Sequence, residues 1–406
     1  MSLTPVEHAQ SQILQRISPL EEEAVSLDEA LGRATTEAAT ALRTLPVADN
    51  SAMDGYAVRA ADVAAPPVSL KIVERIFAGQ APRREVQPGE CARIMTGAQL
   101  PRGADAVIMQ EKTRAGADET TVEILESVKA QANVRSRGED SVEGDVLIPK
   151  GTALGIGELG LLWAQGLSTV RVHRRPRVGI VSSGDELVEI GAPHGGRIYD
   201  TNSPAIAAMV RRAGGVPRKL GIAPDRLEAV RQKIETGLSP DFDVLICIAG
   251  MSVGEKDYVR EVLGMLGVQI DFWRVAMRPG KPLAFGTRGK TLVFGLPGNP
   301  VSSLVTFELF VRPALKKLQG LDPTVPVVPG VMGAALKKPE GLRLFARARV
   351  ALQDGVLVAT PLGSQTSGAL TSAAGATHLV SVPPEVTSVS AGDKVELIPV
   401  SWAPGR

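Results

Sequence analysis

Residues 177–318 alternate short apolar runs of β-type residues with helical patterns, and this alternation constrains the fold more than any other feature of the chain. The first run, RVGIVSSG at 177–184, ends in a polar loop, and a helical pattern follows at 200–215. The later β-type runs lie at 216–223, 243–250, 282–286 and 291–295. Because strands that alternate with helices are joined by crossover connections, the pattern predicts an α/β domain built on a doubly wound, mostly parallel sheet.

The rest of the chain is expected to form further domains, because 406 residues exceed the size at which one hydrophobic core keeps growing. Short β-type runs separated by turns predict a β-rich module at 45–140. Helical patterns on either side of it predict a small discontinuous helical or linking domain. We therefore expect a multidomain α/β protein. Residues 1–44 and 141–175 would form the linking domain, 45–140 the β-rich module, 176–320 the sheet domain and 321–406 a C-terminal β-domain.

Two helical patterns define the linking domain. Residues 4–7, TPVE, read as a capping box in which Thr4 caps the helix and proline takes the first helical position. Val6, Ile13 and Ile17 then fall on one face of the predicted helix. The second pattern covers 151–170 and is expected to pack against the first.

The composition excludes several classes of protein. The formal net charge is +1, from 45 basic and 44 acidic residues, and aromatic residues make up 3% of the chain, so there is neither a global basic field nor a base-stacking surface for nucleic acid. No apolar run approaches the roughly 18 residues of a membrane span, and the amino terminus lacks a signal-type apolar core. We therefore expect a cytoplasmic protein without nucleic-acid or membrane partners.

The two cysteines and four histidines do not suggest a metal site. Cys91 and Cys247 stand in apolar strand-like runs and belong to no CxxC pair, so both are expected to be buried in a protein of a reducing compartment. The histidines at 8, 173, 194 and 378 show no ligand spacing. A site made from histidine and cysteine is therefore not expected.

Polar loops follow the predicted strands at the ends where an open α/β sheet binds its ligands. They carry carboxylates, cations, glycines and a proline-rich turn, and a further loop, MRPGKP, adds two more cations. The loop residues are Asp185, Glu186, Asp225, Gly250, Ser252, Gly254, Asp257, Arg278, Lys281, Pro297, Gly298, Asn299 and Pro300. The sequence thus predicts that these residues gather on one edge of the sheet.

The chemistry of this edge favours a phosphorylated ligand. Asn299 and Pro300 are placed to begin the last helix, with asparagine at the N-cap, so the helix would present free amides to an anion. Arg278 and Lys281 would add positive charge for a phosphate. The carboxylates would repel a phosphate unless a hard cation lay between them, and Mg²⁺ is usually held by one or two carboxylates together with substrate oxygens. The edge therefore predicts a phosphorylated ligand bound with Mg²⁺.

Segments outside this domain complete a pattern that resembles a known family. Three of them, DNSAMDGYAVR at 49–59, RIMTG at 93–97 and RGED at 137–140, lie in the β-rich module. They are followed by SSGDEL, YDTNSPAIAAM, SVGEKDY, RPGKP and GLPGNPVSS, in that order. Together these segments resemble the molybdopterin molybdenumtransferase family, which is MoeA in bacteria and the E domain of gephyrin in animals.

The resemblance implies four domains, an elongated homodimer with a shared active site, and a role in molybdenum cofactor biosynthesis. Its substrates would be molybdate and adenylylated molybdopterin, and the Mg²⁺-dependent insertion of molybdate into the dithiolene would release AMP. The family's functional positions fall on Asp54, Thr96, Asp140, Glu186, Asp225, Asp257, Lys281, Pro297 and Pro300. We take Asp54, Thr96, Asp140, Asp257 and Lys281 as candidate catalytic residues. Glu186, Asp225 and Asp185 are the candidate metal ligands, and the remaining loop residues are candidates for binding the pterin phosphate.

Other functions fit parts of the same pattern. Molybdopterin adenylyltransferases catalyse the preceding step and share a similar sheet domain, but their GGTG-type loop is absent here. A protein that binds finished cofactor without catalysis, or a scaffold, is the alternative from another class. The adenylyltransferase is also a candidate partner, because it would supply the substrate.

Overall fold

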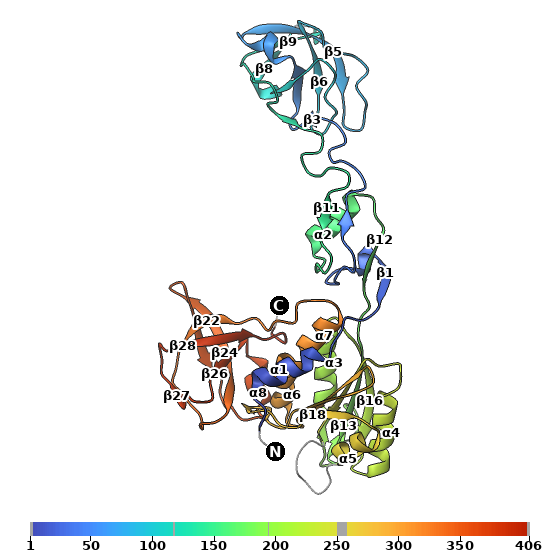
Figure 1. Ribbon diagram of the computed structural model, residues 1–406. Helices are drawn as coiled ribbons and strands as arrows, with labels where there is room; N and C mark the ends of the chain where they lie inside the picture. Colours follow the sequence, from blue (N-terminus) through green and yellow to red (C-terminus); the bar gives the residue numbers. More distant parts are fainter. Residues whose placement is uncertain (1–2, 117, 194, 250–257, 404–406) are drawn as a thin grey trace. The chain divides into compact units, whose positions relative to one another are not determined.

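The computed structural model describes residues 3–116, 118–193, 195–249 and 258–403. The chain divides into two compact units (Figure 1). Unit 1 comprises Met1–Thr36, Gly151–Gly155 and Thr169–Arg406, and unit 2 comprises Glu37–Lys150 and Ile156–Ser168.

A six-stranded sheet forms the centre of unit 1 and confirms the predicted doubly wound α/β fold. Its strand order is β16-β13-β17-β21-β20-β18. The first four strands are parallel, whereas β20 and β18 are antiparallel to their neighbours. The bounds are β13 (Arg177–Ser183), β16 (Val216–Ala223), β17 (Val244–Ile248), β18 (Gln269–Phe272), β20 (Ala284–Arg288) and β21 (Thr291–Leu296).

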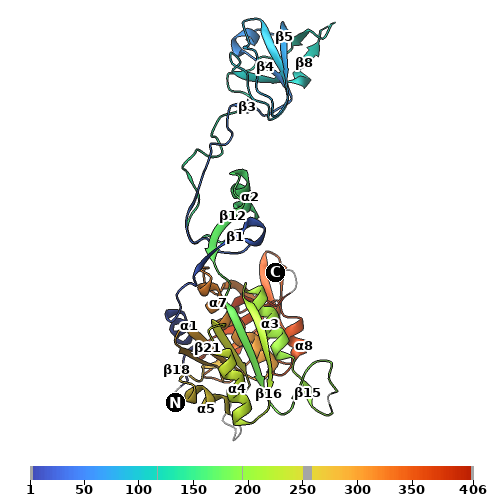
Figure 2. The same ribbon diagram turned by 90° about the vertical axis from the view of Figure 1, so that its right-hand side faces the viewer.

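Helices cover both faces of this sheet (Figure 1 and Figure 2). One face packs against α4 (Leu227–Gly237) and α5 (Tyr258–Met265). The other packs against α3 (Asn202–Arg212), α1 (Val6–Gln15) and the helical stretch made of α6 (Pro300–Thr306), the π-helix η4 (Phe307–Val311) and α7 (Arg312–Leu318). The short pair β14 (Leu187–Val188) and β15 (Ile198–Tyr199) lies between β13 and α3 in the chain. Because both faces are covered, the central strands β17 and β21 are apolar and buried along almost their whole length rather than alternating.

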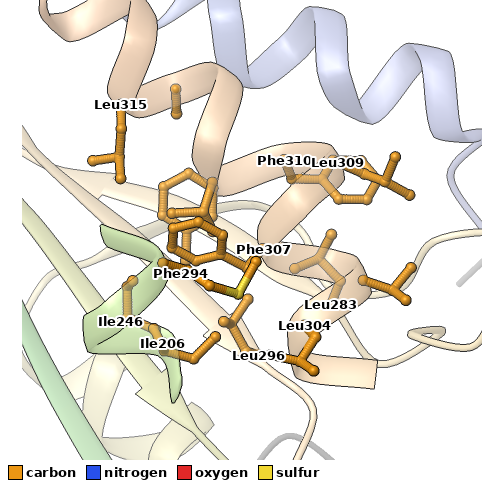
Figure 3. Packing of buried hydrophobic residues seen from close by; sticks show 14 of the residues in the cluster. Ile206, Ile246, Leu283, Phe294, Leu296, Leu304, Phe307, Leu309, Phe310 and Leu315 are labelled. Carbon is orange, nitrogen blue, oxygen red and sulfur yellow. The ribbon is translucent and has the colours of Figure 1, made fainter. Parts of the chain in front are cut away.

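The larger core lies under α3, α6 and α7 (Figure 3). Phe294 of β21 and Phe307 of η4 are fully buried there beside Ile246 and Leu296. Full burial of one such side chain contributes about 1.5–3 kcal/mol to folding. This packing fixes the helical stretch that begins at Pro300 against the sheet, and with it the loop that precedes the stretch.

The C-terminal part of unit 1 is a second six-stranded sheet in the order β19-β24-β25-β22-β28-β26, with an additional pairing between β24 and β26. Its bounds are β19 (Met277–Arg278), β22 (Val328–Met332), β24 (Arg343–Gln353), β25 (Val356–Pro361), β26 (His378–Val382) and β28 (Lys394–Pro399). Short elements complete it: β23 (Leu336–Lys337), β27 (Ser388–Val389) and α8 (Leu370–Ala374). β19 lies in the chain between β18 and β20 of the first sheet, but it pairs with β24 of the second. This pairing holds Arg278 beside the C-terminal sheet.

Unit 2 contains a sheet in the order β7-β4-β6-β5-β9-β8. Its strands are β4 (Gly55–Val58), β5 (Val68–Ile76), β6 (Glu90–Ile94), β7 (Ala106–Met109), β8 (Thr113–Ala115) and β9 (Thr121–Ile124). The same unit holds α2 (Ile156–Ala164) and two short pairs, β2 (Ala39–Thr40) with β11 (Val146–Ile148) and β3 (Asn50–Ser51) with β10 (Val134–Arg135). Cys91 of β6 and Cys247 of β17 are buried, and burial raises the pKa of both thiols to about 12.

The structure corrects two sequence predictions. Thr4 does not cap α1, because its amide donates to the carbonyl of Arg274 and its carbonyl accepts from Ala276, so Pro5 becomes the N-cap residue. The pattern at 151–170 is helical only over α2, and the chain then forms β12 (Thr169–His173), which pairs with β1 (Glu22–Ser26). None of the helices in the described ranges is long and apolar enough to cross a bilayer.

Candidate functional site

The carboxyl ends of the four parallel strands share one edge of the first sheet, here called the ligand edge. Gly184–Glu186 follows β13, and Asp225 lies two residues after the end of β16. Ala249 follows β17, and the prolyl loop Pro297–Pro300 directly follows β21. The strand order places β16 on one side of β13 and β17 on the other, so the direction of winding reverses between β13 and β17. Ligands of open α/β sheets bind at such a switch point.

Asp185 and Asp225 bind each other's main chain at this edge. The amide of Asp225 donates to Oδ1 of Asp185 at 3.0 Å, and the amide of Asp185 donates to Oδ2 of Asp225 at 3.4 Å. Each carboxylate keeps its other oxygen outside this pair of bonds. The two loops are thereby held together, and both negative charges stay at the ligand edge.

Glu186 lies next to this pair, with its carboxylate folded over Gly184. A Cβ built on Gly184 would come within 2.5 Å of Oε2 of Glu186, and the φ of Gly184 is +149°. A larger residue at 184 would therefore displace the carboxylate. Glycine at this position lets the side chain of Glu186 approach the strand end.

The predicted metal ligands do not form a closed cage. No group of three or more histidine, cysteine, aspartate or glutamate residues within the described ranges is arranged to hold a metal ion. Asp185 and Asp225 each use one carboxylate oxygen for a main-chain amide. The assignment of Glu186 and Asp225 as metal ligands, with Asp185 in support, remains a prediction, and all three residues lie on the same edge.

The prolyl loop is anchored from several sides. Its Pro297 carbonyl accepts from the hydroxyl of Ser303, and its Gly298 carbonyl accepts from Nδ2 of Asn202 at 2.7 Å. Asn299 is the N-cap residue of α6, as predicted, but its side chain makes no capping hydrogen bond. The amide of Val301 donates to the carbonyl of Ser367 at 3.0 Å, so the first turn is not free for an anion as the sequence suggested.

Asp200 is a structural residue of this edge that sequence reasoning missed. Its buried carboxylate accepts from the amide of Asn202 at 3.1 Å and from the amide and hydroxyl of Ser203. Ser203 in turn shares a 2.7 Å hydrogen bond with Ser182 at the end of β13. This network fixes the start of α3 and aims Asn202 at the prolyl loop. The available signal was an aspartate at the first position of the helical pattern at 200–215, two residues before α3 begins.

Arg278 ends β19, and Lys281 lies in the loop that leads from β19 to β20; both side chains are exposed. The carbonyl of Lys281 accepts from the amide of Val275, and Gly280 packs so closely on Thr306 that a Cβ would lie 2.5 Å from the threonine methyl group. The loop is therefore held by its main chain against α6. Its two cationic side chains are left available to a ligand.

Arg347 of β24 is the second residue that the sequence analysis missed, and it is fully buried. Its Nη2 donates to the carbonyls of Ser364 and Thr366 at 3.1 and 3.0 Å, and its Nε donates to the hydroxyl of Ser372 at 3.2 Å. Nη1 is buried and has no hydrogen-bond partner in the described part of the chain. Burial, followed by the nearby charge of Arg278, lowers the pKa of Arg347 to about 10.

The loop 364–372 connects this arginine to the prolyl loop. Ser372 holds the Arg347 guanidinium, and the carbonyl of Ser367 accepts from Val301 at the start of α6. Arg278 and Arg347 thus form a pair of cations beside the prolyl loop, and no carboxylate in the described ranges bonds either of them. A buried guanidinium nitrogen without a partner carries a desolvation cost, which an anionic ligand would remove.

Asp54 and Thr96 form a second candidate centre within unit 2. The amide and the hydroxyl of Thr96 donate to Oδ1 of Asp54 at 2.7 and 2.8 Å. These bonds, first from the amide and then from the hydroxyl, lower the pKa of the exposed Asp54 carboxyl. Asp140 is exposed in a turn of the same unit, and its amide donates to the carbonyl of Leu45.

Four predicted residues, Gly250, Ser252, Gly254 and Asp257, lie outside the described residues. The structure places the other candidates in two groups. One group is the ligand edge of unit 1, and the other is the pair Asp54 and Thr96 with Asp140 in unit 2.

Three family models match consecutive parts of the chain. The MoeA N-terminal region (domain I and II) matches residues 4–166, the probable molybdopterin binding domain matches 179–317, and the MoeA C-terminal region (domain IV) matches 329–400. The ligand edge and both cationic residues Arg278 and Lys281 fall within the second match. Arg347 falls within the third.

Curated relatives cover nearly the whole chain. The molybdopterin molybdenumtransferase of Haemophilus influenzae is 36% identical over 399 residues, which are 97% of this chain and 98% of that protein. The protein of the same name from Nostoc sp. is 43% identical over 307 residues, covering 74% and 70%. The crystal structure of a molybdopterin biosynthesis MoeA protein from Pyrococcus horikoshii has a TM-score of 0.83 at 27% identity and covers 98% of this chain.

The fold and the ligand edge define a multidomain α/β protein with a doubly wound, ligand-binding sheet. Because the relatives share 36% and 43% of their residues with this chain over most of its length, the chain belongs to the molybdopterin molybdenumtransferase (MoeA) family.

Proposed function

We propose that this protein is a molybdopterin molybdotransferase, an enzyme of molybdenum cofactor biosynthesis. Its substrates are molybdate and adenylylated molybdopterin, and it inserts molybdate into the dithiolene with release of AMP. The names of the relatives support the transferase activity, and the match to a probable molybdopterin binding domain supports the pterin substrate. The observation that carries the proposal is the buried Arg347 with its unpartnered Nη1 beside Arg278.

This pair of guanidinium groups suits a doubly charged tetrahedral oxyanion. A guanidinium presents donors in a rigid fork that matches oxyanion geometry, and charge-assisted hydrogen bonds are shorter and stronger than neutral ones. Ser372, Ser364 and Thr366 fix the orientation of Arg347, and its buried Nη1 has no acceptor among the described residues. Molybdate is such an anion, and Arg278 adds a second positive charge from an exposed position.

The neighbouring prolyl loop and Lys281 serve the phosphate end of the other substrate. Lys281 supplies a point charge from a loop whose main chain is fixed. The loop Pro297–Pro300, anchored by Asn202 and Ser303, shapes the floor beside it. The oxyanion and the pterin phosphate thus bind on adjoining parts of one edge.

A divalent cation fits the carboxylates of this edge in one particular way. Mg²⁺ commonly takes one or two protein carboxylates and completes its shell with water and substrate oxygens, so it needs no closed cage. Glu186 and Asp225 would hold it, with Asp185 in support. When bound, the ion would neutralise phosphate charge.

We further propose that the protein acts as a homodimer with shared active sites. Asp54, Thr96 and Asp140 belong to unit 2, whereas the ligand edge belongs to unit 1. A two-fold dimer allows unit 2 of one subunit to complete the ligand edge of the other. Asp54, kept ionised by Thr96, would then act beside the substrates bound in the partner subunit.

Variants of the arginine pair test the oxyanion site. Equilibrium dialysis of the full-length protein with molybdate is expected to show saturable binding, and Arg278→Ala is expected to weaken it at least about tenfold, since loss of a charge-assisted contact costs about 1.5–3 kcal/mol. Arg347→Lys keeps a buried positive charge but loses the fork, and should weaken binding similarly. Arg349→Ala, an exposed arginine two residues along the same strand, is the matched control. Wild-type affinity in both Arg278→Ala and Arg347→Lys would refute the site.

A further inference from the structure

A cavity of about 490 Å³ lies at the opposite end of α3 from the ligand edge. It is lined by segments that are distant in sequence, all of them in unit 1. Arg175 lies just before β13, and Arg211 and Arg212 form the last turn of α3. The cavity is therefore on the side of the amino ends of the parallel strands, whereas Asp185, Asp225 and the prolyl loop are on the side of their carboxyl ends.

The side chains that line this cavity are strongly cationic. Six of them carry a positive charge and one carries a negative charge. The cations are Arg33, Arg175, Arg211, Arg212, Arg312 and Lys316, and the anion is Glu308. Since the whole chain has a net charge of +1, such an excess of positive charge around one cavity is a local feature and not a reflection of composition.

Glu308 neutralises one of these cations. It is fully buried in the π-helix η4, and its Oε1 lies 2.7 Å from Nε of Arg312. Its Oε2 accepts from the amide of Ser401 at 3.1 Å and from the hydroxyl of the same residue. The carboxylate is thus committed to α7 and to the chain end, and does not balance the other arginines. Single-turn π-helices are frequent at functional sites.

The remaining cations are poorly compensated. Arg33 is buried and its Nη2 bonds the carbonyl of His173 and the exposed carboxylate of Glu23, but its Nε has no partner among the described residues. No ion pair within the described ranges engages Arg175, Arg211, Arg212 or Lys316.

Burial adds to the cost of this arrangement. Lys316 is partly buried, and desolvation together with the charge of Arg312 lowers its pKa. Asp322 and Glu308 both act to raise the pKa of Lys316 against these effects. Asp322 lies outside the cavity lining, and its own carboxylate accepts two bonds from Thr324. Like charges that converge on a cavity from which water is partly excluded repel one another more strongly than in bulk water. A bound polyanion would relieve this repulsion and use donors that have no other acceptor.

We propose that this cavity binds a multiply charged phosphate anion, such as a diphosphate group. Arg211, Arg212 and Arg175 would contact it from the exposed side, and Lys316 from the half-buried side. Phosphate oxygens match the forked donors of arginine, and several arginines around one cavity favour a polyphosphate over a single carboxylate. This inference is independent of the proposed transferase activity, because none of these residues belongs to the ligand edge.

The test uses the full-length protein and inorganic diphosphate in a magnesium-free buffer that contains EDTA, so that cation-dependent binding at the ligand edge is suppressed. Isothermal titration calorimetry is expected to show saturable binding, of which one diphosphate per chain remains when Arg278→Ala/Lys281→Ala removes the cations of the ligand edge. The double variant Arg211→Ala/Arg212→Ala should lower the affinity at least about tenfold, because two charged contacts are lost. Both side chains are exposed at a helix end, so the fold should persist, as a thermal melt would verify.

Two further variants make the result specific. Arg83→Ala/Arg84→Ala removes the same charge from an adjacent, exposed arginine pair in unit 2 and is expected to bind diphosphate as the wild type does. Arg278→Ala/Lys281→Ala alters the ligand edge and should also retain binding. The proposal is overturned if the wild type shows no saturable binding, if Arg211→Ala/Arg212→Ala binds normally, or if either of the other pairs loses as much affinity.

Discussion

Asp185 and Asp225, which are 40 residues apart in the sequence, each accept a hydrogen bond from the other's main-chain amide. Each residue therefore has two separable properties, an oxygen that holds the neighbouring loop and a negative charge. Asparagine keeps an acceptor oxygen in the same place and removes the charge. The substitution can thus separate a structural role from binding of a cation.

We predict that Asp185→Asn and Asp225→Asn will each raise the Mg²⁺ concentration needed for half-maximal activity. Asp225→Asn should give the larger effect, about tenfold or more, which corresponds to about 1.4 kcal/mol. The melting temperature should change little, because the loop contact persists. Mg²⁺ titration of the initial rate measures the first quantity. Glu189→Gln, an exposed carboxylate nearby in the chain, is the control. An unchanged Mg²⁺ requirement in Asp225→Asn would exclude it as a ligand.

The sequence predicted the ligand edge well for a physical reason. Buried parallel strands are nearly continuous apolar runs, so their ends are visible, and topology alone brings the residues after those ends together. Asp185, Asp225 and Pro297 were found in this way. The amide of Val301 was expected to be free but is bonded to Ser367, a contact made across about 66 residues that no local pattern encodes.

Arg347 was missed because its surroundings are created by tertiary packing. It stands in the strand RLFARARVALQ, where arginines alternate with small residues as they would on a solvated face. Pairing of β24 with both β25 and β26, and the loop 364–372, bury it instead. Thr4 failed as a helix cap for the same kind of reason, since its main chain is held by residues 274 and 276.

Lys281 is expected to contribute charge to substrate binding and little to the fold. Lys281→Ala should raise the apparent KM for adenylylated molybdopterin about fivefold to tenfold, with a smaller change in kcat, because an exposed point charge contributes about 1 kcal/mol or slightly more when it meets a phosphate. Lys290→Ala is the control, since this exposed lysine lies in the turn between β20 and β21 at the far end of the hairpin. An unchanged KM in Lys281→Ala would remove the residue from the site.

The Asp54 carboxyl should stay ionised well into the acid range. Its pKa in the folded protein is lowered by the amide of Thr96 first and by the hydroxyl second. The ionised carboxylate therefore stabilises the folded state at pH values above the unfolded pKa, and this stabilisation is lost as the pH falls through the lower folded pKa. Thr96→Val removes the hydroxyl and leaves the amide, so the pKa should rise part of the way to its ordinary value. Carbon-detected NMR titration of labelled aspartate, assigned with Asp54→Asn, measures both values. A titration of Asp54 above the ordinary aspartate range would contradict the geometry.

The proposed homodimer with shared active sites predicts complementation between subunits. Asp54→Ala and Glu186→Ala homodimers should each be nearly inactive. A mixed dimer would carry both lesions in one site and leave the other intact, and should recover about half of the wild-type activity per dimer. Mixing Asp54→Ala with Thr96→Ala, two lesions of the same unit, should recover none. Subunit exchange without recovery in the first mixture would show that both residues act within one chain.

Insertion of molybdenum by this chain is tested most directly with the purified full-length protein, Mg²⁺, molybdate and adenylylated molybdopterin. The measurement is the amount of pterin-bound molybdenum, by mass spectrometry after removal of free molybdate, together with the AMP released. We expect both products in equal amounts, with none in the absence of the protein. Formation of adenylylated pterin from ATP, or binding of finished cofactor without release of AMP, would contradict the transferase account.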